Sequence, residues 1–146
     1  MEVEFQVLQT NSLVDVLNYI CTQVSDNYIT NKRLAILAPS GVAKELDTVL
    51  WQAGQESFIP HFCALNAKEY NTFKGIPILI TDNVFIVNNF DELINIMDIG
   101  IDKNKVKVSK LIEVVYQDNK ALDSSRKKYV FYKKSGLEIK TKKTSF

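Results

Sequence analysis

Residues 3–52 alternate between two hydrophobic periodicities, and this alternation constrains the fold more than any other feature of the chain. VEFQVL (3–8) alternates with the period of a half-buried strand. The segment 12–29 has its apolar residues on one helical face, at Leu13, Val16, Leu17, Ile20, Val24 and Tyr28. RLAILA (33–38) is a nearly continuous apolar run, typical of a parallel strand covered on both faces. PSGVAKELDTVLWQ (39–52) is a turn followed by a second helix. This order predicts parallel pairing through right-handed crossovers, and therefore an α/β fold.

The later segments continue this pattern less regularly. IPILIT (76–81) and KLIEVVYQ (110–117) are predicted strands, and DNVFIVNN (82–89) is a candidate short strand or hairpin partner. ELINIMD (92–98) fits either a helix or a strand, and we choose the strand because its Ile-rich centre is short. The last ten residues, LEIKTKKTSF, form a basic tail with room for a short strand.

Two helix ends carry specific signals. Ser12 and Asp15 have the spacing of a capping box at the start of the first helix. The segment 121–136 is predicted to be a helix that stops at Gly136, after two lysines that favour the negative end of the helix dipole.

Size and composition are those of an ordinary globular protein. The 146 residues, 46% of them hydrophobic and 24% charged, predict one domain spanning 1–146, with a mostly parallel, twisted sheet flanked by helices. No apolar run approaches the roughly 18 residues of a membrane span, and MEVEFQVLQT lacks the regions of a signal peptide. Cys21 and Cys63 are expected to be buried free thiols. A cytoplasmic protein without membrane contact is therefore predicted.

Charge is distributed unevenly along the chain. Residues 120–146 hold nine Lys or Arg against Asp123 and Glu138, a net charge of +7, whereas residues 1–119 hold nine basic and fifteen acidic residues, a net charge of −6. A basic C-terminal helix and tail (118–146) is thus predicted to meet an anionic partner. The alternative is a solvated basic surface without a partner.

The chain lacks motifs for catalysis or cofactor binding. APSGVAK (38–44) has neither the phosphate loop G-x-x-x-x-G-K-[ST] nor G-x-G-x-x-G. His61 is the sole imidazole, and no third residue is nominated to orient it beside Ser57 or Cys63. One His and two distant Cys cannot supply a metal site. We therefore expect no enzymatic activity, no cofactor, no metal and no small-molecule substrate.

A cluster of aromatic and rigid residues surrounds the histidine. Trp51 ends the second helix, and Phe58, Ile59 and Pro60 lie just before His61. Such side chains fit either the hydrophobic core or an interface anchor. The residues themselves leave both interpretations open.

The same stretch carries a family resemblance. L-D-x-x-L-W (46–51), five intervening residues and S-F-I-P-H (57–61) resemble the hallmark of the chi subunit of bacterial DNA polymerase III holoenzyme. Further segments are similar to that family in the same order: PILIT (77–81), ELINI (92–96), IEVVYQ (112–117) and SSRKKYVFYKKSG (124–136). The resemblance therefore covers nearly the whole chain.

The resemblance implies a non-catalytic accessory subunit of the replisome, located with it in the cytoplasm at the nucleoid. It implies a nucleotide-binding-like topology without a phosphate loop. It implies a heterodimer with the subunit psi, which links chi to the clamp loader, and binding to the acidic C-terminal tail of single-stranded DNA-binding protein. DNA contact would be indirect. The residues carried over to psi binding by the motif are Trp51, Phe58, Pro60 and His61.

The basic helix fits the second partner. Leu122, Arg126, Tyr129 and Lys133 recur at i, i+4, i+7 and i+11 and so form one stripe. Arg126 can hold a carboxylate through two donors, Lys133 adds positive charge, and the other two offer an apolar floor for an aromatic residue. Two alternatives are a nucleic-acid-binding module that uses the basic region directly on phosphate, and an ordinary solvated helix face with Tyr129 packed inward.

Overall fold

The sheet is entirely parallel. The computed structural model describes residues 1–53, 59–65 and 75–146, and in this part of the chain seven strands form one sheet in the order β3-β4-β2-β5-β6-β1-β7. The strands are β1 (Glu2–Val7), β2 (Leu34–Leu37), β3 (His61–Ala64), β4 (Ile78–Thr81), β5 (Glu92–Asn95), β6 (Lys110–Val115) and β7 (Ile139–Lys143). The predicted α/β class, with a parallel sheet and flanking helices in a single domain, is confirmed.

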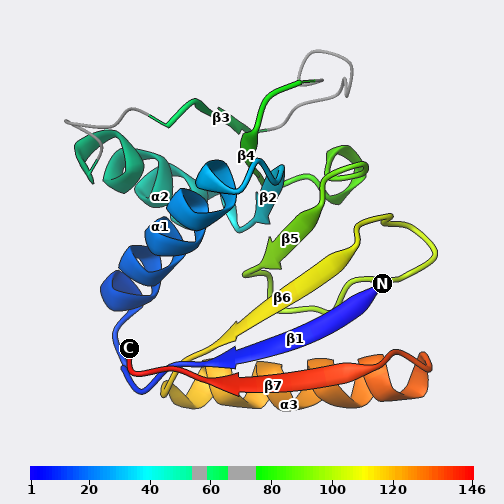
Figure 1. The fold of residues 1–146 in the computed structure, drawn as a ribbon. Coiled ribbons are helices and arrows are strands. Elements are labelled where there is room, and N and C mark those ends of the chain that lie inside the picture. The colour runs from blue at the N-terminus through cyan, green and yellow to red at the C-terminus, as the bar shows by residue number, and fades with distance from the viewer. Residues whose placement is uncertain (54–58, 66–74) are drawn as a thin grey trace.

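Helices cover both faces of this sheet (Figure 1). The helices α1 (Leu13–Ile29) and α2 (Ser40–Ala53) pack on one face, where their apolar residues meet Ile36, Ile80 and Ile112 of the central strands. On the other face lie α3 (Asn119–Lys134) and the loops between β4 and β6. Since side chains alternate along each strand, every central strand contributes to both cores. This explains why RLAILA carries almost no polar residue.

The start of α1 differs from the predicted capping box. Ser12 is the N-cap, but its side chain makes no capping hydrogen bond. The Thr10 hydroxyl donates to the Asp15 carboxylate at 2.6 Å and accepts from the Ser12 backbone N–H at 3.1 Å. The prediction of a Ser12–Asp15 box is therefore wrong, because Thr10 binds the Ser12 N–H and the Asp15 carboxylate, which a capping box would pair with each other.

The helix α3 has well-defined ends. The Asp118 side chain accepts a hydrogen bond from the Ala121 backbone N–H at 3.1 Å and caps the first turn. Beyond the last turn Gly136 has a positive φ of 76°, and the Leu137 N–H donates to the Tyr132 carbonyl at 3.2 Å. This is a Schellman-type stop, so the predicted end at Gly136 is confirmed.

Four other parts of the chain can be compared with their predicted structure. ELINI forms a strand as chosen, but DNVFIVNN does not: residues Val84–Ile86 are a 3₁₀ turn, η2, capped by the Asn83 side chain. No strand could follow β4 there and pair with it, because β3 and β2 already occupy both its sides. His61, for which no strand was predicted, begins the strand β3. Residues 139–143 of the expected tail form the edge strand β7 beside β1.

Two further findings concern the described residues alone. None of their helices combines the length and apolarity needed to cross a bilayer. Cys21 and Cys63 are both free and partly buried.

Candidate functional site

Trp51 and His61 meet at the edge of the sheet formed by β3. Trp51 lies in the last turn of α2 and is 55% exposed. Its ring packs on the imidazole of His61, with centroids 4.8 Å apart and planes inclined by 57°. The indole is therefore supported by the His61 ring and remains more than half exposed. This is the geometry of an aromatic anchor presented on a rigid base.

The buried side chain of His61 supports the ring of Trp51. Its side chain is only 2% exposed, and its Nε2 lies 3.1 Å from Oδ1 of Asp47 in α2. Its Nδ1 lies 2.9 Å from the carbonyl oxygen of Ile59. His61 thus fastens α2 to the start of β3 and holds the ring of Trp51 in place.

The structure gives less information about Pro60 and Phe58, the other two residues predicted for this surface. Pro60 directly precedes His61 and is partly buried. Phe58 lies outside the described residues, as does Ser57. The structure therefore brings Trp51 and His61 together, and Pro60 is next to His61 in the chain.

The surroundings of His61 do not suit nucleophilic catalysis. Burial, helped by the carboxylates of Asp47 and Asp82, raises the pKa of the Cys63 thiol. Burial also raises the pKa of Cys21 to about 11. Both cysteines are therefore protonated at neutral pH and poor nucleophiles.

A second candidate surface lies at the opposite edge of the sheet, between α3 and the last strands. A shallow pocket of about 210 Å³ opens there. Three residues of the predicted stripe, Leu122, Arg126 and Tyr129, line it together. Ser125 of α3 also lines the pocket, and the strands supply the remaining residues: Phe5, Val7, Val115 and Thr141. The stripe is thus the rim of a concave site with an apolar floor, which we call the α3 pocket.

The side chains of the α3 pocket combine a cation with aromatic surface. Arg126 is exposed, and no carboxylate of the described residues lies within ion-pair distance of its guanidinium. Tyr129 stays partly exposed and meets Phe5 edge to face, with centroids 5.6 Å apart. Lys133 is not part of the lining, but its Nζ lies 5.9 Å from the centroid of the Tyr129 ring. An anion attached to an apolar group fits this arrangement.

Sequence reasoning missed the strand residues of the α3 pocket. The alternation in VEFQVL places Phe5 and Val7 on one face of β1. Which helix covers that face depends on the order of strands in the sheet, which local periodicity does not contain. Only the fold brings these residues next to Arg126.

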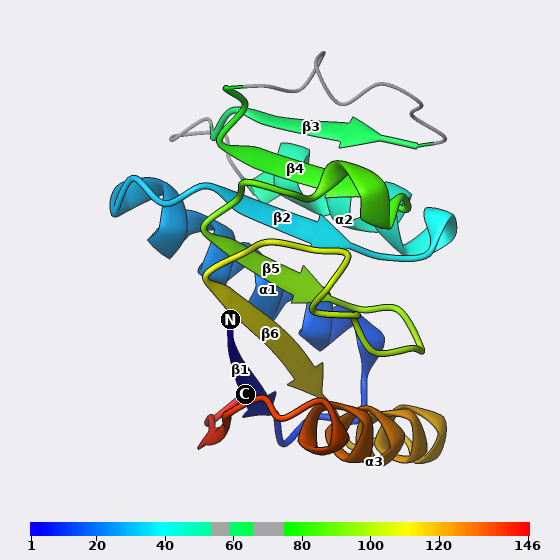
Figure 2. The ribbon, with the colours of Figure 1, turned by 90° about the vertical axis from the view of Figure 1, so that its right-hand side faces the viewer.

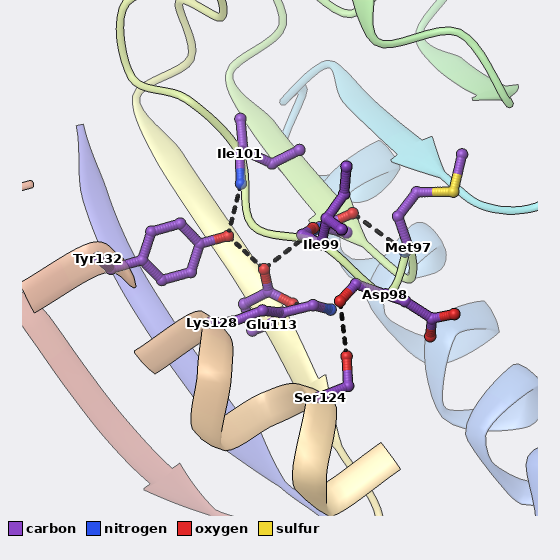
Figure 3. A network of polar contacts seen from close by, with 9 residues as sticks. Met97, Asp98, Ile99, Ile101, Glu113, Ser124, Lys128 and Tyr132 are labelled. Atoms are coloured by element: carbon purple, nitrogen blue, oxygen red, sulfur yellow. Dashed lines mark hydrogen bonds and ion pairs between the residues drawn. The ribbon is translucent and has the colours of Figure 1, made fainter. Parts of the chain in front are cut away.

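A buried polar network holds α3 against the sheet (Figure 3). Glu113 of β6 accepts from Lys128 Nζ at 2.9 Å, from the Tyr132 hydroxyl and from Asn95 Nδ2 at 2.9 Å. The Tyr132 hydroxyl in turn accepts from the Ile101 backbone N–H at 3.0 Å. This network links α3 to β5, β6 and the loop after β5.

The groups of this network shift one another's pKa values. Burial raises the pKa of the Glu113 carboxyl, and the Lys128 charge and the hydrogen bonds from Tyr132 and Asn95 oppose that rise. Burial and the nearby Glu113 carboxylate raise the pKa of Tyr132. The network was not predicted, although a lone glutamate inside the apolar strand KLIEVV was a signal that it needs a buried partner.

The two surfaces are far apart. Figure 2 shows β3 at one edge of the sheet and α3 beside the other. Because β3 and β7 are the first and last of seven strands, six steps of about 4.8 Å, or roughly 29 Å, separate them. Two macromolecules could thus bind without overlap.

Comparison with known proteins agrees with the sequence motifs. The sequence profile of the family described as DNA polymerase III chi subunit, HolC, matches residues 1–140. The matched range includes both candidate surfaces up to the start of β7. A search of curated proteins returned no match.

Proposed function

The chain belongs to the DNA polymerase III chi subunit family, whose role is that of a polymerase accessory subunit, and we propose that it bridges two partners in the replisome. One partner is psi, which connects it to the clamp-loader assembly. The other is the acidic C-terminal tail of single-stranded DNA-binding protein. In this role the protein carries no catalytic activity of its own, and its contact with DNA is indirect.

The separation of the two candidate surfaces carries this proposal. A bridging subunit must hold both partners at once, so its two sites must not overlap. Trp51 lies beside one edge strand, β3, and the α3 pocket lies beside the other, β7. This arrangement supports a bridge.

Psi docks on the surface around Trp51. An exposed tryptophan supported by a buried histidine is pre-organised, so little side-chain entropy is lost on binding. Pro60 and Phe58 belong to the same motif and complete the proposed contact.

The acidic tail docks in the α3 pocket. Its terminal aromatic residue enters between Leu122 and Tyr129, and a carboxylate pairs with Arg126. Lys133, one turn farther along α3, adds positive charge beside Tyr129. The apolar floor suits a tail that ends in an aromatic residue better than it suits a nucleic-acid backbone.

A double-variant experiment tests the bridge. The purified protein is mixed with psi and with a peptide that copies the acidic tail, and complexes are measured by size-exclusion chromatography and fluorescence anisotropy. Wild-type protein should bind both at once; Trp51→Ala should lose psi and keep the peptide; Arg126→Ala should lose the peptide and keep psi. Competition between the two partners would contradict the proposal. Strong binding to naked single-stranded DNA without peptide binding would favour a nucleic-acid-binding module.

A further inference from the structure

The outer edge of β7 presents unpaired backbone groups. The Val3 N–H donates to the Glu138 carbonyl at 3.2 Å, and the Thr144 N–H donates to the Val7 carbonyl at 2.9 Å. In a parallel ladder the residues that bond one neighbour alternate with residues whose N–H and C=O point to the other side. Lys140 and Lys142 therefore bond β1, and the outward groups are those of Ile139, Thr141 and Lys143. No strand of the described chain pairs with this edge.

Lysines stand on both faces of this edge. Lys143 is the register partner of Val7, so it shares the sheet face of the α3 pocket, whereas Lys142 points to the face of α1. Lys140 pairs with Glu2 at 3.2 Å. Within the described residues, neither Lys142 nor Lys143 has a carboxylate at ion-pair distance. Two cations that form no close ion pair with the described residues thus flank the outward backbone groups.

The edge is continuous with the α3 pocket. Thr141 lines the pocket with its side chain, and its backbone N–H and C=O point outward from β7. An extended peptide that leaves the pocket can therefore run directly along the strand.

We propose that the outer edge of β7 binds an extended acidic peptide segment as an additional strand, next to the α3 pocket. This inference rests on the proposed function, since the occupant is the acidic segment that precedes the aromatic end of the tail. Backbone groups of the segment pair with Ile139, Thr141 and Lys143. Its side chains alternate between the two faces, so carboxylates reach Lys142 on one face and Lys143 on the other.

Charge selects this occupant over a second copy of the chain. If β7 of another copy paired with this edge, lysines would face lysines, and like charges opposite each other destabilise a strand pair. With an acidic segment in place of a second β7, each of these contacts joins opposite charges and is attractive. The charges of this edge therefore favour pairing with an acidic strand and disfavour pairing with β7 of a second copy.

Methylation of single peptide amides tests the strand directly. The probe is a synthetic aspartate-rich peptide ending in phenylalanine with a free carboxylate, and each backbone nitrogen is methylated in turn. If the segment pairs with β7, affinity should fall roughly 2- to 10-fold at every second position, because only alternate N–H groups face β7. Losses without alternation, or no losses upstream of the terminal residues, would overturn the added strand.

A matched pair of protein variants gives an independent test. Lys143→Ala removes only the side-chain charge, whereas Lys143→Pro also removes an outward N–H without touching the bonds to β1. Lys143→Pro should bind the unmethylated peptide roughly 2- to 10-fold more weakly than Lys143→Ala. Equal affinities would contradict the added strand; if the proline variant fails to fold, the methylation series on wild-type protein decides.

These outcomes separate the two proposals. If the peptide binds wild-type protein and Arg126→Ala weakens that binding, but methylation produces no alternating losses of affinity, the bridging function is supported and the proposed added strand is wrong. If the unmethylated peptide does not bind wild-type protein, both are wrong.

Discussion

Lys128 and Glu113 form an almost completely buried ion pair: Nζ lies 2.9 Å from Oε1, and the two side chains are 8% and 2% exposed. The pair fixes which side of α3 faces the sheet. With Lys128 and Tyr132 directed inward, Arg126 and Tyr129 are left on the rim of the α3 pocket. The buried pair therefore positions a surface to which it does not itself belong.

The first prediction concerns removal of the cation. Lys128→Met should lower the free energy of unfolding by about 3–5 kcal/mol, because it leaves the Glu113 carboxylate buried without its counter-charge. Urea unfolding at about pH 7 measures the loss. The control is Lys127→Met: Lys127 pairs with Asp123 on the solvent side of α3, so its loss should stay within about 0.5 kcal/mol.

The stability of Lys128→Met should also depend on pH in a characteristic way. Burial already raises the pKa of Glu113, and loss of Lys128 removes the charge that opposes this rise. Above the unfolded-state value of about 4.3 the native state of the variant then binds more protons than the unfolded state, so stability falls as pH rises through this window. The deficit relative to wild type should therefore be smaller near pH 4 than near pH 7. An equal deficit at both values would show that lost packing, not charge, is responsible.

Local periodicity was enough for most of the fold. The strand–helix–strand–helix start and the stop of α3 at Gly136 follow from apolar spacing and turn chemistry, whereas the strand ELIN was chosen over a helix because its Ile-rich centre is short. The tail LEIKTKKTSF was expected to have room for a short strand, and IKTKK forms one, because an edge strand buries little of its surface and tolerates lysines. The partner of that strand and the conformation of the segment 82–89 depend on neighbours in space, which local periodicity does not contain. The segment 82–89 has strand-like composition, yet both sides of β4 were already occupied.

The candidate sites were predictable to a similar degree. Helical spacing and the chemistry of Arg126 indicated a stripe on α3, and the structure supplies the pocket floor from β1, β6 and β7. The sequence also singled out Trp51 and His61. The sequence could not predict that the His61 side chain is buried while Trp51 is exposed. That difference arises from the contacts of the imidazole with Asp47 and with the Ile59 carbonyl.

The second prediction concerns the anchor for psi. Trp51→Ala should weaken psi binding by about 2 kcal/mol or more, roughly 30-fold, because a supported aromatic anchor is lost. Since Trp51 is largely exposed, thermal stability should change little. Isothermal titration calorimetry with psi, beside a thermal melt, measures both. Phe85→Ala is the matched control, because Phe85 is a 70% exposed aromatic outside this surface.

Phe58→Ala extends this test to the part of the motif outside the described residues. If Phe58 is an anchor, psi binding should weaken with little change in melting temperature. A large drop in melting temperature with unchanged psi binding would instead place Phe58 in the core.

The third prediction concerns catalysis. The purified subunit should neither hydrolyse nucleoside triphosphates nor polymerise nucleotides, because APSGVAK lacks a phosphate loop and His61 is held by Asp47 and Ile59. Phosphate release and primer extension are the measurements. Turnover that His61→Ala abolishes would contradict the prediction.

The last prediction separates a defined pocket from diffuse positive charge. Arg126→Ala should weaken binding of the acidic-tail peptide by about 1.5–3 kcal/mol, roughly 10- to 150-fold, because a charge-assisted hydrogen bond is lost. Arg126→Lys should restore only part of the affinity, since an ammonium group cannot reproduce the planar two-donor fork of arginine. Lys127→Ala removes the same charge from the neighbouring residue on the outer side of α3. Its effect should be small and should fade at higher salt, because exposed charges are screened. Fluorescence anisotropy at two salt concentrations compares the three variants, and equal small losses for Arg126→Ala and Lys127→Ala would mean that charge alone, without the pocket, attracts the tail.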